Sequence, residues 1–156
     1  MHKFIEFIKR KLKVQLMRLL KPILDELSLT TYRTYGSSKK LFIHPSAKVS
    51  NSLFNTFSGD IKIDEFAFTG HNVSFLTGTH NYNLSDMERM IDIPLEGNDI
   101  HIKKGAWIGS NSTIIGPCII HENAVVAAGS VVVNDVEKNT IVGGCPAKFI
   151  KIINIC

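Results

Sequence analysis

Histidine is the residue type whose chemistry stands out in this sequence of 156 residues. A neutral imidazole accepts a proton near pH 7, so a positioned histidine is a candidate general base. His80 is the strongest candidate because it lies in the run Thr-Gly-Thr-His-Asn-Tyr at residues 77–82, where the sequence pattern changes. A lone histidine would ordinarily be expected only to cap a loop. The other histidines lie at turns, at a terminus or outside any motif: His2, His44, His71, His101 and His121.

Two other chemistries find less support in the sequence. A catalytic zinc site needs about three protein ligands, and His71 and His80 are nine residues apart with no closely spaced pair elsewhere. Cys145 could be a nucleophile, but no nearby residue looks like its base. The spacing of Cys118, Cys145 and Cys156 is not that of a disulfide framework. We therefore expect no metal, and a reducing compartment such as the cytoplasm.

A six-residue repeat must position these side chains. An aliphatic residue recurs at every sixth position, and a small or slim residue follows each one by four. The two series are Ile102, Ile108, Ile114, Ile120, Val126 and Val132, and Ala106, Ser112, Cys118, Ala124, Ser130 and Val136. A period of six fits neither a helix nor a long strand. Three such hexads can close one triangular coil with the aliphatic residues inside, so the repeat predicts a parallel β-helix.

The repeat continues less regularly toward the N-terminus. Its inward positions are predicted at Ile43 and Val49, then, offset by two residues, at Phe57, Ile63, Thr69 and Phe75. The offset predicts a bulged corner or a small insertion near Asn55 and Thr56. The separation of Phe75 and Ile102 is not a multiple of six, so a loop at residues 80–99 should leave the prism. Such insertions often form the binding face of a solenoid.

The first 40 residues have a different composition. Residues 1–27 hold seven basic and three acidic side chains, which accounts for the formal net charge of +4 of the whole chain. Apolar residues recur there at spacings of three and four, which predicts an amphipathic helix that Pro22 kinks or divides: Phe4, Ile8, Leu12, Leu16, Leu19, Leu20, Ile23 and Leu27. The helix could lie on an anionic membrane surface, or it could pack on the β-helix or a neighbouring subunit, which we favour.

Residues 28–40 are predicted to be a connector, and the repeat region shows no basic patch of the kind that binds nucleic acid. No apolar run reaches the length of a membrane span. We therefore expect no nucleic-acid partner.

The repeat, the run at residues 77–82 and the Trp-Ile-Gly-Ser sequence at residues 107–110 together resemble the hexapeptide-repeat acyltransferases. The resemblance is to the branch of galactoside, maltose and xenobiotic acetyltransferases and of sugar O-acetyltransferases of polysaccharide synthesis. It implies an all-β fold, a left-handed parallel β-helix, which we expect at residues 41–151. The match covers about residues 57–151, so the N-terminal helix and connector at 1–40 and the tail at 152–156 are expected from the sequence pattern and not from the resemblance. The γ-class carbonic anhydrases share this fold but hold zinc through three histidines, two of them closely spaced.

The resemblance also implies an activity and its residues. It implies direct transfer of an acetyl group from acetyl-CoA to a sugar hydroxyl, with His80 as the general base. The residues expected to bind coenzyme A are Trp107, Ser110, Ala128, Val133, Asn134, Lys148 and Lys151. The acceptor residues do not come from the resemblance. The loop and the irregularity near Asn55 are expected to shape the pocket for a saccharide or nucleotide-sugar acceptor, with Asn55, Tyr82, Asp86 and Arg89 as the candidate binding residues. The chain departs from the family at Asn134, where lysine is frequent, and at the lysines of its C-terminal Gly-x-Pro-Ala-Lys motif, where arginine is frequent.

Family members form homotrimers with sites between subunits, and the sequence is compatible with such an assembly. Several outward positions of the predicted prism are apolar and should be covered by other copies of the chain: Trp107, Ile119, Val125 and Val131. Two alternatives stay open. One is an N-acetyltransferase that acts on an amino sugar, and the other is a non-catalytic β-helix that serves as a structural or anchoring module. In each case we expect a cytoplasmic protein, at the inner face of the membrane if the helix binds lipid.

Overall fold

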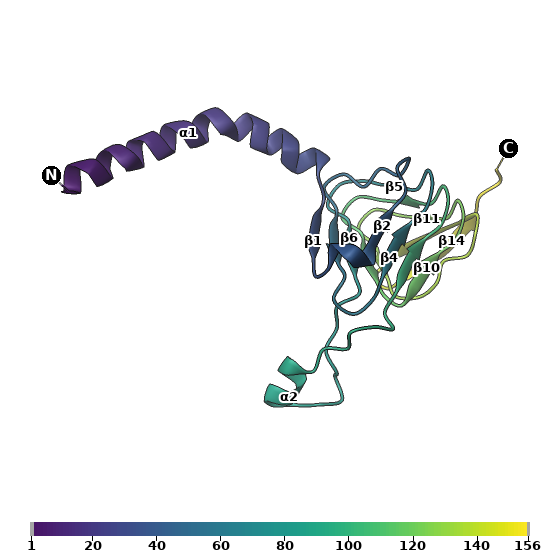
Figure 1. Cartoon of the computed structure of the whole chain (residues 1–156). Helices are drawn as coiled ribbons and strands as arrows, with labels where there is room; N and C mark the ends of the chain where they lie inside the picture. The colour runs from purple at the N-terminus through teal and green to yellow at the C-terminus, as the bar shows by residue number, and fades with distance from the viewer. Residues whose placement is uncertain (1, 156) are drawn as a thin grey trace.

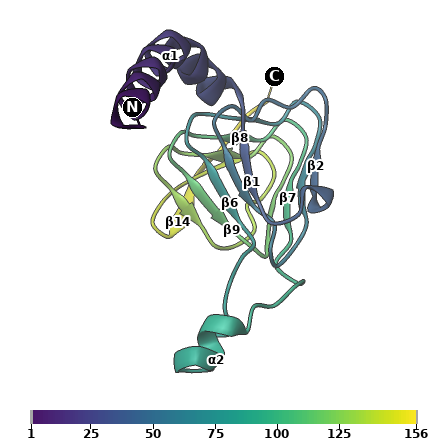
Figure 2. The same ribbon diagram turned by 60° about the vertical axis from the view of Figure 1, so that its left-hand side comes forward.

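The computed structural model describes residues 2–155, which form a three-sided prism with two projections (Figure 1). A long helix, α1 (His2–Thr30), extends from the end of the prism where the chain enters it. A loop that carries the short helix α2 (Asp86–Ile91) projects from another side. In Figure 2 the two projections again point away from each other.

Three sheets form the sides of the prism. Sheet A contains β1 (Arg33–Tyr35), β3 (Leu53–Asn55), β6 (Ser74–Leu76), β9 (Thr113–Ile115) and β12 (Val131–Val132). Sheet B contains β2 (Leu41–Ile43), β4 (Ile61–Ile63), β7 (Ile100–Ile102) and β10 (Cys118–Ile120), and the 3₁₀ turn η1 (Ser38–Lys40) precedes it. Sheet C contains β5 (Phe68–Thr69), β8 (Trp107–Ile108), β11 (Val125–Val126), β13 (Thr140–Gly144) and β14 (Ala147–Ile152).

Successive coils stack in parallel, as the repeat predicts. Ile120 pairs with Ile102, which pairs with Ile63, and Ile63 pairs with Ile43. The inward aliphatic residues from Ile102 to Val132 and the slim residues four positions after them are all buried. The predicted parallel β-helix is therefore confirmed. The term all-β holds only for the prism, since α1 alone comprises 29 residues.

The corners of the prism explain why asparagine and glycine recur between the strands of the repeat. A backbone with positive φ turns the chain between sheets, and asparagine and glycine adopt it at low cost. Asn51, Asn72 and Asn111 stack at the corner between sheets C and A with φ of 51°, 56° and 60°. Their side chains form a ladder, in which Asn51 Nδ2 donates to Asn72 Oδ1 (2.7 Å) and Asn72 Nδ2 donates to Asn111 Oδ1 (3.3 Å).

The structure corrects two details of the first coils. Phe57, predicted to point inward, is 49% exposed, and Phe54 is fully buried in its place. Phe54 pairs with Phe75, and residues 56–60 form the insertion that the offset near Asn55 and Thr56 predicted. Strand β1 also lies within the segment predicted as a connector. It pairs in parallel with β3, so the coils begin at Arg33, before the expected boundary at residue 41.

Helix α1 is continuous through Pro22, which therefore does not divide it, and Figure 1 shows the helix bending along its length. Every side chain at positions 11–24 is exposed. At these positions the predicted apolar stripe therefore does not pack on the chain's own prism, which was one of the expected roles of the helix. Among residues 2–155, no helix is both long and apolar enough to cross a bilayer.

The corrected assignment of inward residues predicts that two nearby phenylalanines, Phe54 and Phe57, differ in their contribution to stability. Phe54 stacks on Phe75 with ring centroids 4.9 Å apart and meets the edge of Tyr32 at 5.5 Å. We expect Phe54→Ala to lower the free energy of unfolding by about 3–5 kcal/mol, because it leaves a cavity in a packed core. Phe57→Ala, the matched control, should change it by about 0.5 kcal/mol or less. Urea denaturation at one protein concentration measures both. Equal losses of unfolding free energy in the two variants would show that Phe54 is wrongly assigned as the inward residue.

Candidate active site

The loop that carries His80 lies between sheets A and B. It leaves β6 after Leu76, forms helix α2 at its tip and returns to β7 at Ile100. This excursion coincides with the break in the six-residue period. Two contacts close its stem. Asn81 Nδ2 donates to Asp92 Oδ2 (3.0 Å), and the Asn81 backbone N–H donates to the Asp92 carbonyl (3.2 Å).

The loop fixes the tautomer of His80. Nδ1 of His80 lies 3.0 Å from the carbonyl oxygen of Arg89. A carbonyl oxygen can only accept a hydrogen bond, so Nδ1 carries the proton and donates it there. In the neutral imidazole, Nε2 is then left with its lone pair. The ring is exposed, so Nε2 is accessible to an incoming hydroxyl.

Arg89 braces the same part of the loop with its side chain. Its Nε donates to the Leu84 carbonyl (2.6 Å) and its Nη2 donates to the Tyr82 carbonyl (3.3 Å). The guanidinium was predicted to contact the acceptor, but here it ties together the turn that follows His80. A planar fork of donors suits this bridging of two carbonyls. The contact with an acceptor stays a prediction, and the bracing is what the structure shows.

His80 lines a hollow of about 470 Å³ at the root of the loop. The loop supplies Thr77, Gly78, Tyr82 and Pro94, and the next coil supplies Ile115, Gly116 and Pro117. A volume of this size is typical of a small-molecule site. The residues of the next coil were not predicted to belong to the site. The strand register could have identified them. The Gly116 N–H donates to the Leu76 carbonyl, so this corner lies directly beside the root of the loop.

Asn55 lies against the same root. A Cβ atom on Gly78 would come within 2.6 Å of both the Asn55 Nδ2 and Oδ1 atoms, so a side chain at position 78 would have to displace the Asn55 amide. The side-chain oxygen of Asn55 also accepts from the Phe57 N–H (3.1 Å). Tyr82 is 80% exposed beside the hollow. Asp86 begins helix α2 at the loop's tip and does not line the hollow. Binding of an acceptor by these residues stays a prediction.

The predicted coenzyme A residues lie on other parts of the prism. Trp107 projects outward from sheet C, is 46% exposed and stacks on Phe68 with ring centroids 5.7 Å apart. Ser110 and Ala128 lie at the corner between sheets C and A, where Ser110 Oγ accepts from the His71 N–H (3.0 Å). Ala128 is exposed, so its small side chain leaves the backbone open there.

The remaining candidates follow the last coils. Val133 and Asn134 are exposed after β12, at the corner between sheets A and B. Lys148 and Lys151 are exposed on β14, which runs antiparallel to β13 at the edge of sheet C. The hollow at His80 is lined by none of the predicted coenzyme A residues. A single chain therefore does not bring the candidate base and this set together.

The other candidate chemistries gain nothing from the structure. Within residues 2–155, no three histidine, cysteine, aspartate or glutamate side chains gather as metal ligands would. His101 Nε2 instead lies 2.9 Å from Asp64 Oδ1. Burial, with a smaller contribution from Asp135, raises the pKa of the Cys118 thiol to about 12, so this thiol is inert.

Comparison with known proteins points to one family. Residues 99–134 match the bacterial transferase hexapeptide family (six repeats). Serine acetyltransferase 2 of Arabidopsis thaliana is 34% identical over 113 residues, which are 71% of this chain and 32% of that protein. The chain thus spans about a third of this relative's length.

Two solved structures extend the comparison. A hexapeptide-repeat acetyltransferase of Vibrio cholerae, in complex with acetyl coenzyme A, has a TM-score of 0.62 and 26% identity, covering 80% of this chain and 66% of that one. A maltose O-acetyltransferase from Clostridium difficile has a TM-score of 0.54 and 25% identity, covering 80% and 68%. The repeat, the coiled fold and these relatives confirm the resemblance that the sequence motifs predicted, which is to the hexapeptide-repeat acyltransferases.

Proposed function

We propose that the chain is an acetyl-CoA-dependent O-acetyltransferase whose acceptor is a sugar hydroxyl of a saccharide or glycan precursor. The observation that carries the proposal is the tautomer of His80, whose Nε2 keeps its lone pair while the residue lines a hollow of small-molecule size. The similarity to a maltose O-acetyltransferase supports the sugar, and the similarity to an acetyltransferase in complex with acetyl coenzyme A supports the donor. We infer a left-handed coil from the same relatives.

His80 would act on both halves of the transfer. Its Nε2 accepts the acceptor's hydroxyl proton while the oxygen attacks the thioester carbonyl. The Arg89 carbonyl holds the Nδ1–H throughout, so the imidazolium that forms is stabilised where it is needed. When the carbon–sulfur bond breaks, Nε2 returns the proton to the departing thiolate. The acetyl group passes directly to the acceptor, and His80 ends neutral, as it began.

The site would be completed between subunits. His80 lies at the corner between sheets A and B, whereas Ser110 and Ala128 lie at the corner between sheets C and A. In a homotrimer of prisms, a loop of one copy can face the cofactor corner of the next. Outward apolar side chains such as Trp107 and Ile115, which are 46% and 38% exposed in one chain, support such contacts.

A second acceptor has a specific observation in its favour. The relative from Arabidopsis thaliana is a serine acetyltransferase, so the hydroxyl of serine is the alternative acceptor to a sugar. Both acceptors would need the same base. The N-acetyltransferase of amino sugars and the non-catalytic module are the remaining alternatives. Measuring release of the coenzyme A thiol with a panel of sugars, nucleotide-sugars, amino sugars and serine distinguishes these four functions. A protein that neither releases the thiol nor binds coenzyme A would be the non-catalytic module.

We place the reaction in the cytoplasm and in polysaccharide synthesis. Cys118 and Cys145 are free thiols, which fits a reducing compartment.

Removal of the imidazole tests the base. We expect His80→Ala to lower turnover roughly 10²–10⁴-fold, the usual contribution of a positioned general base, with affinity for coenzyme A nearly unchanged. Thiol release measures turnover, and calorimetry measures binding. His44→Ala is the matched control, because this exposed histidine lies outside the hollow at His80 and its ring is hydrogen-bonded to Ser46 across its own turn. Full activity of His80→Ala would remove His80 from the mechanism.

Loss of the brace tests how the base is positioned. In Arg89→Gln the two side-chain bonds to loop carbonyls are lost, so the Arg89 carbonyl can move away from Nδ1 of His80. We expect kcat to fall about 10- to 100-fold through misplacement of the base, with an unchanged KM for acetyl-CoA. Glu88→Gln, on the same short helix, should match the wild type. A changed KM for acetyl-CoA with constant kcat would contradict a positioning role.

Mixed trimers test the shared site. Ala128→Trp should block the cofactor corner and His80→Ala should remove the base, so each variant alone should be inactive or nearly so. Co-assembled at equal amounts, about one quarter of the sites would combine an intact loop with an intact corner from its neighbour. We therefore expect activity to return to about a quarter of the wild-type value, measured after co-refolding.

The control for this experiment mixes two defects of the same loop. His80→Ala with Arg89→Gln leaves every loop defective, so the mixture should show no gain over the mean of its parents. Absence of any gain from the first mixture, in a trimer verified by sedimentation, would show that the two sets of residues do not share a site. Sedimentation of the wild type as a monomer would contradict the trimer itself.

A further inference from the structure

Helix α1 accounts for the net positive charge of the chain. Residues 1–27 hold seven basic and three acidic side chains, and basic and acidic residues balance in the rest of the chain. The prism is thus neutral overall, and the excess of four positive charges is confined to one projecting helix. Such a helix attracts anionic surfaces, and this attraction weakens only beyond about 8–10 Å at moderate salt.

The same helix displays apolar side chains to solvent. Leu12, Leu19 and Ile23 are 66%, 75% and 55% exposed and lie on one stripe with Leu16 and Leu27. These five residues, spaced by three or four, are called the leucine stripe below. Lys9 and Lys13 fall at the border of the leucine stripe in a helix of 3.6 residues per turn. Long lysine side chains in this position can reach from an apolar surface to a polar layer above it.

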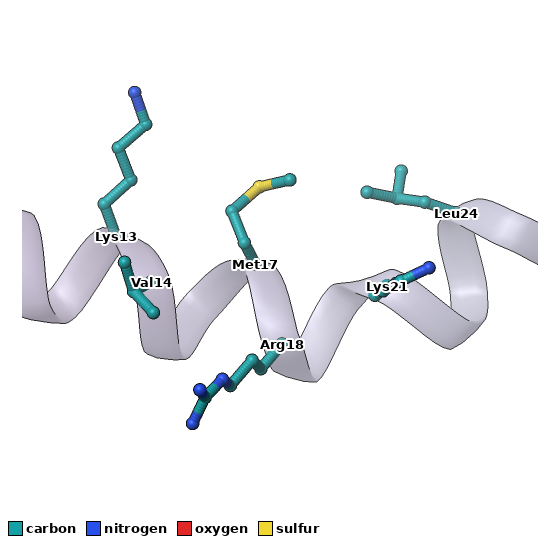
Figure 3. Close-up of a pocket in the computed structure, with 6 residues that line it drawn as sticks. All are labelled: Lys13, Val14, Met17, Arg18, Lys21 and Leu24. Atoms are coloured by element: carbon teal, nitrogen blue, oxygen red, sulfur yellow. The ribbon is translucent and has the colours of Figure 1, made fainter.

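At positions 11–24, the part of the chain that the structure describes does not cover α1. Figure 3 shows a shallow hollow beside the helix whose six lining residues, from Lys13 to Leu24, all belong to α1. Figures 1 and 2 show the helix directed away from the prism. About 43 Å of amphipathic helix is therefore presented to the surroundings, at 1.5 Å per residue. A surface of this kind is costly in water and indicates a partner.

We propose that α1 is an interfacial anchor that lies on the surface of an anionic phospholipid bilayer. The leucine stripe would enter the boundary between headgroups and acyl chains, and the basic residues would lie among the headgroups. Charge decides between a bilayer and a second copy of the helix. Two copies would bring two net positive segments together, whereas an acidic lipid surface attracts each lysine or arginine near it. The anchor is independent of the proposed acetyl transfer.

Vesicle binding tests the anchor with the full chain. The protein should co-sediment with vesicles of phosphatidylcholine and phosphatidylglycerol, bind phosphatidylcholine alone at least about tenfold more weakly, and detach as salt is raised. Lys13→Glu with Arg18→Glu should weaken binding at least about tenfold. The matched control is Lys62→Glu with Lys138→Glu, two exposed lysines of the prism. It changes the net charge equally and should bind like the wild type.

A second pair of variants tests the leucine stripe. Leu12→Gln with Leu19→Gln keeps good helix formers and removes apolar surface, so it should also weaken vesicle binding, while helix content measured by circular dichroism stays constant. Sedimentation of the same variants reports on the assembly. If the leucine variants lower the oligomeric state and the wild type ignores anionic vesicles, α1 is an assembly element and the proposal is overturned. Equal loss of binding in the Lys62 and Lys138 control would also overturn it.

Discussion

The fold depends on the hydrogen bonds and side-chain contacts between each coil and the next. Among residues 2–155, each parallel strand pairs with strands one full coil away and has no partner nearby in sequence. The coils approach closely at their corners. A Cβ on Gly109 would lie 2.5 Å from the backbone nitrogen of Ala128, so a side chain at this position would force the coils apart. Once the inward column of Ile and Val is packed, the strand alternation fixes which side chains point outward. The outward position of Trp107 is therefore a consequence of burying Ile108.

Within residues 2–155, the candidate base His80 lies on the long loop that leaves this regular prism. The loop at residues 77–99 is held by polar contacts rather than by a core of its own. Asn81 and Asp92 close its stem, and Lys40 Nζ donates to the Leu95 carbonyl (2.6 Å) from the neighbouring sheet. The tautomer of His80 is set by a main-chain carbonyl, so the candidate base depends on the conformation of the loop more than on the identity of any neighbouring side chain. A rigid scaffold with a braced loop is a common way to place a catalytic group.

These facts explain what the sequence could and could not predict. From Ile102 onward each hexad supplies both an aliphatic and a slim residue, so the inward frame was correct. Counting back from Phe75 in steps of six reaches Phe57, whereas the residue that pairs with Phe75 is Phe54. The insertion at residues 56–60 shifts the count, and the sequence could not reveal this because both residues are phenylalanine. Strand β1 has no aliphatic residue to mark it, and it forms only by pairing with β3. The partner of His80 was beyond prediction, since every residue has a carbonyl and only the loop's path selects that of Arg89.

The placement of α1 relative to the loop bears on how an anchor and an acyl-transfer site could coexist. The Asn51 N–H donates to the Thr31 carbonyl (3.1 Å), so the helix leaves the prism at the corner between sheets C and A, where Ser110 and Ala128 also lie. The loop with His80 leaves from the next corner, and both views show it directed away from α1 (Figures 1 and 2). A bilayer that held the helix would therefore leave the hollow at His80 open to the surroundings. The proposed anchor and the proposed acceptor hollow would therefore lie on different sides of one chain, because the two projections arise from different corners of the prism.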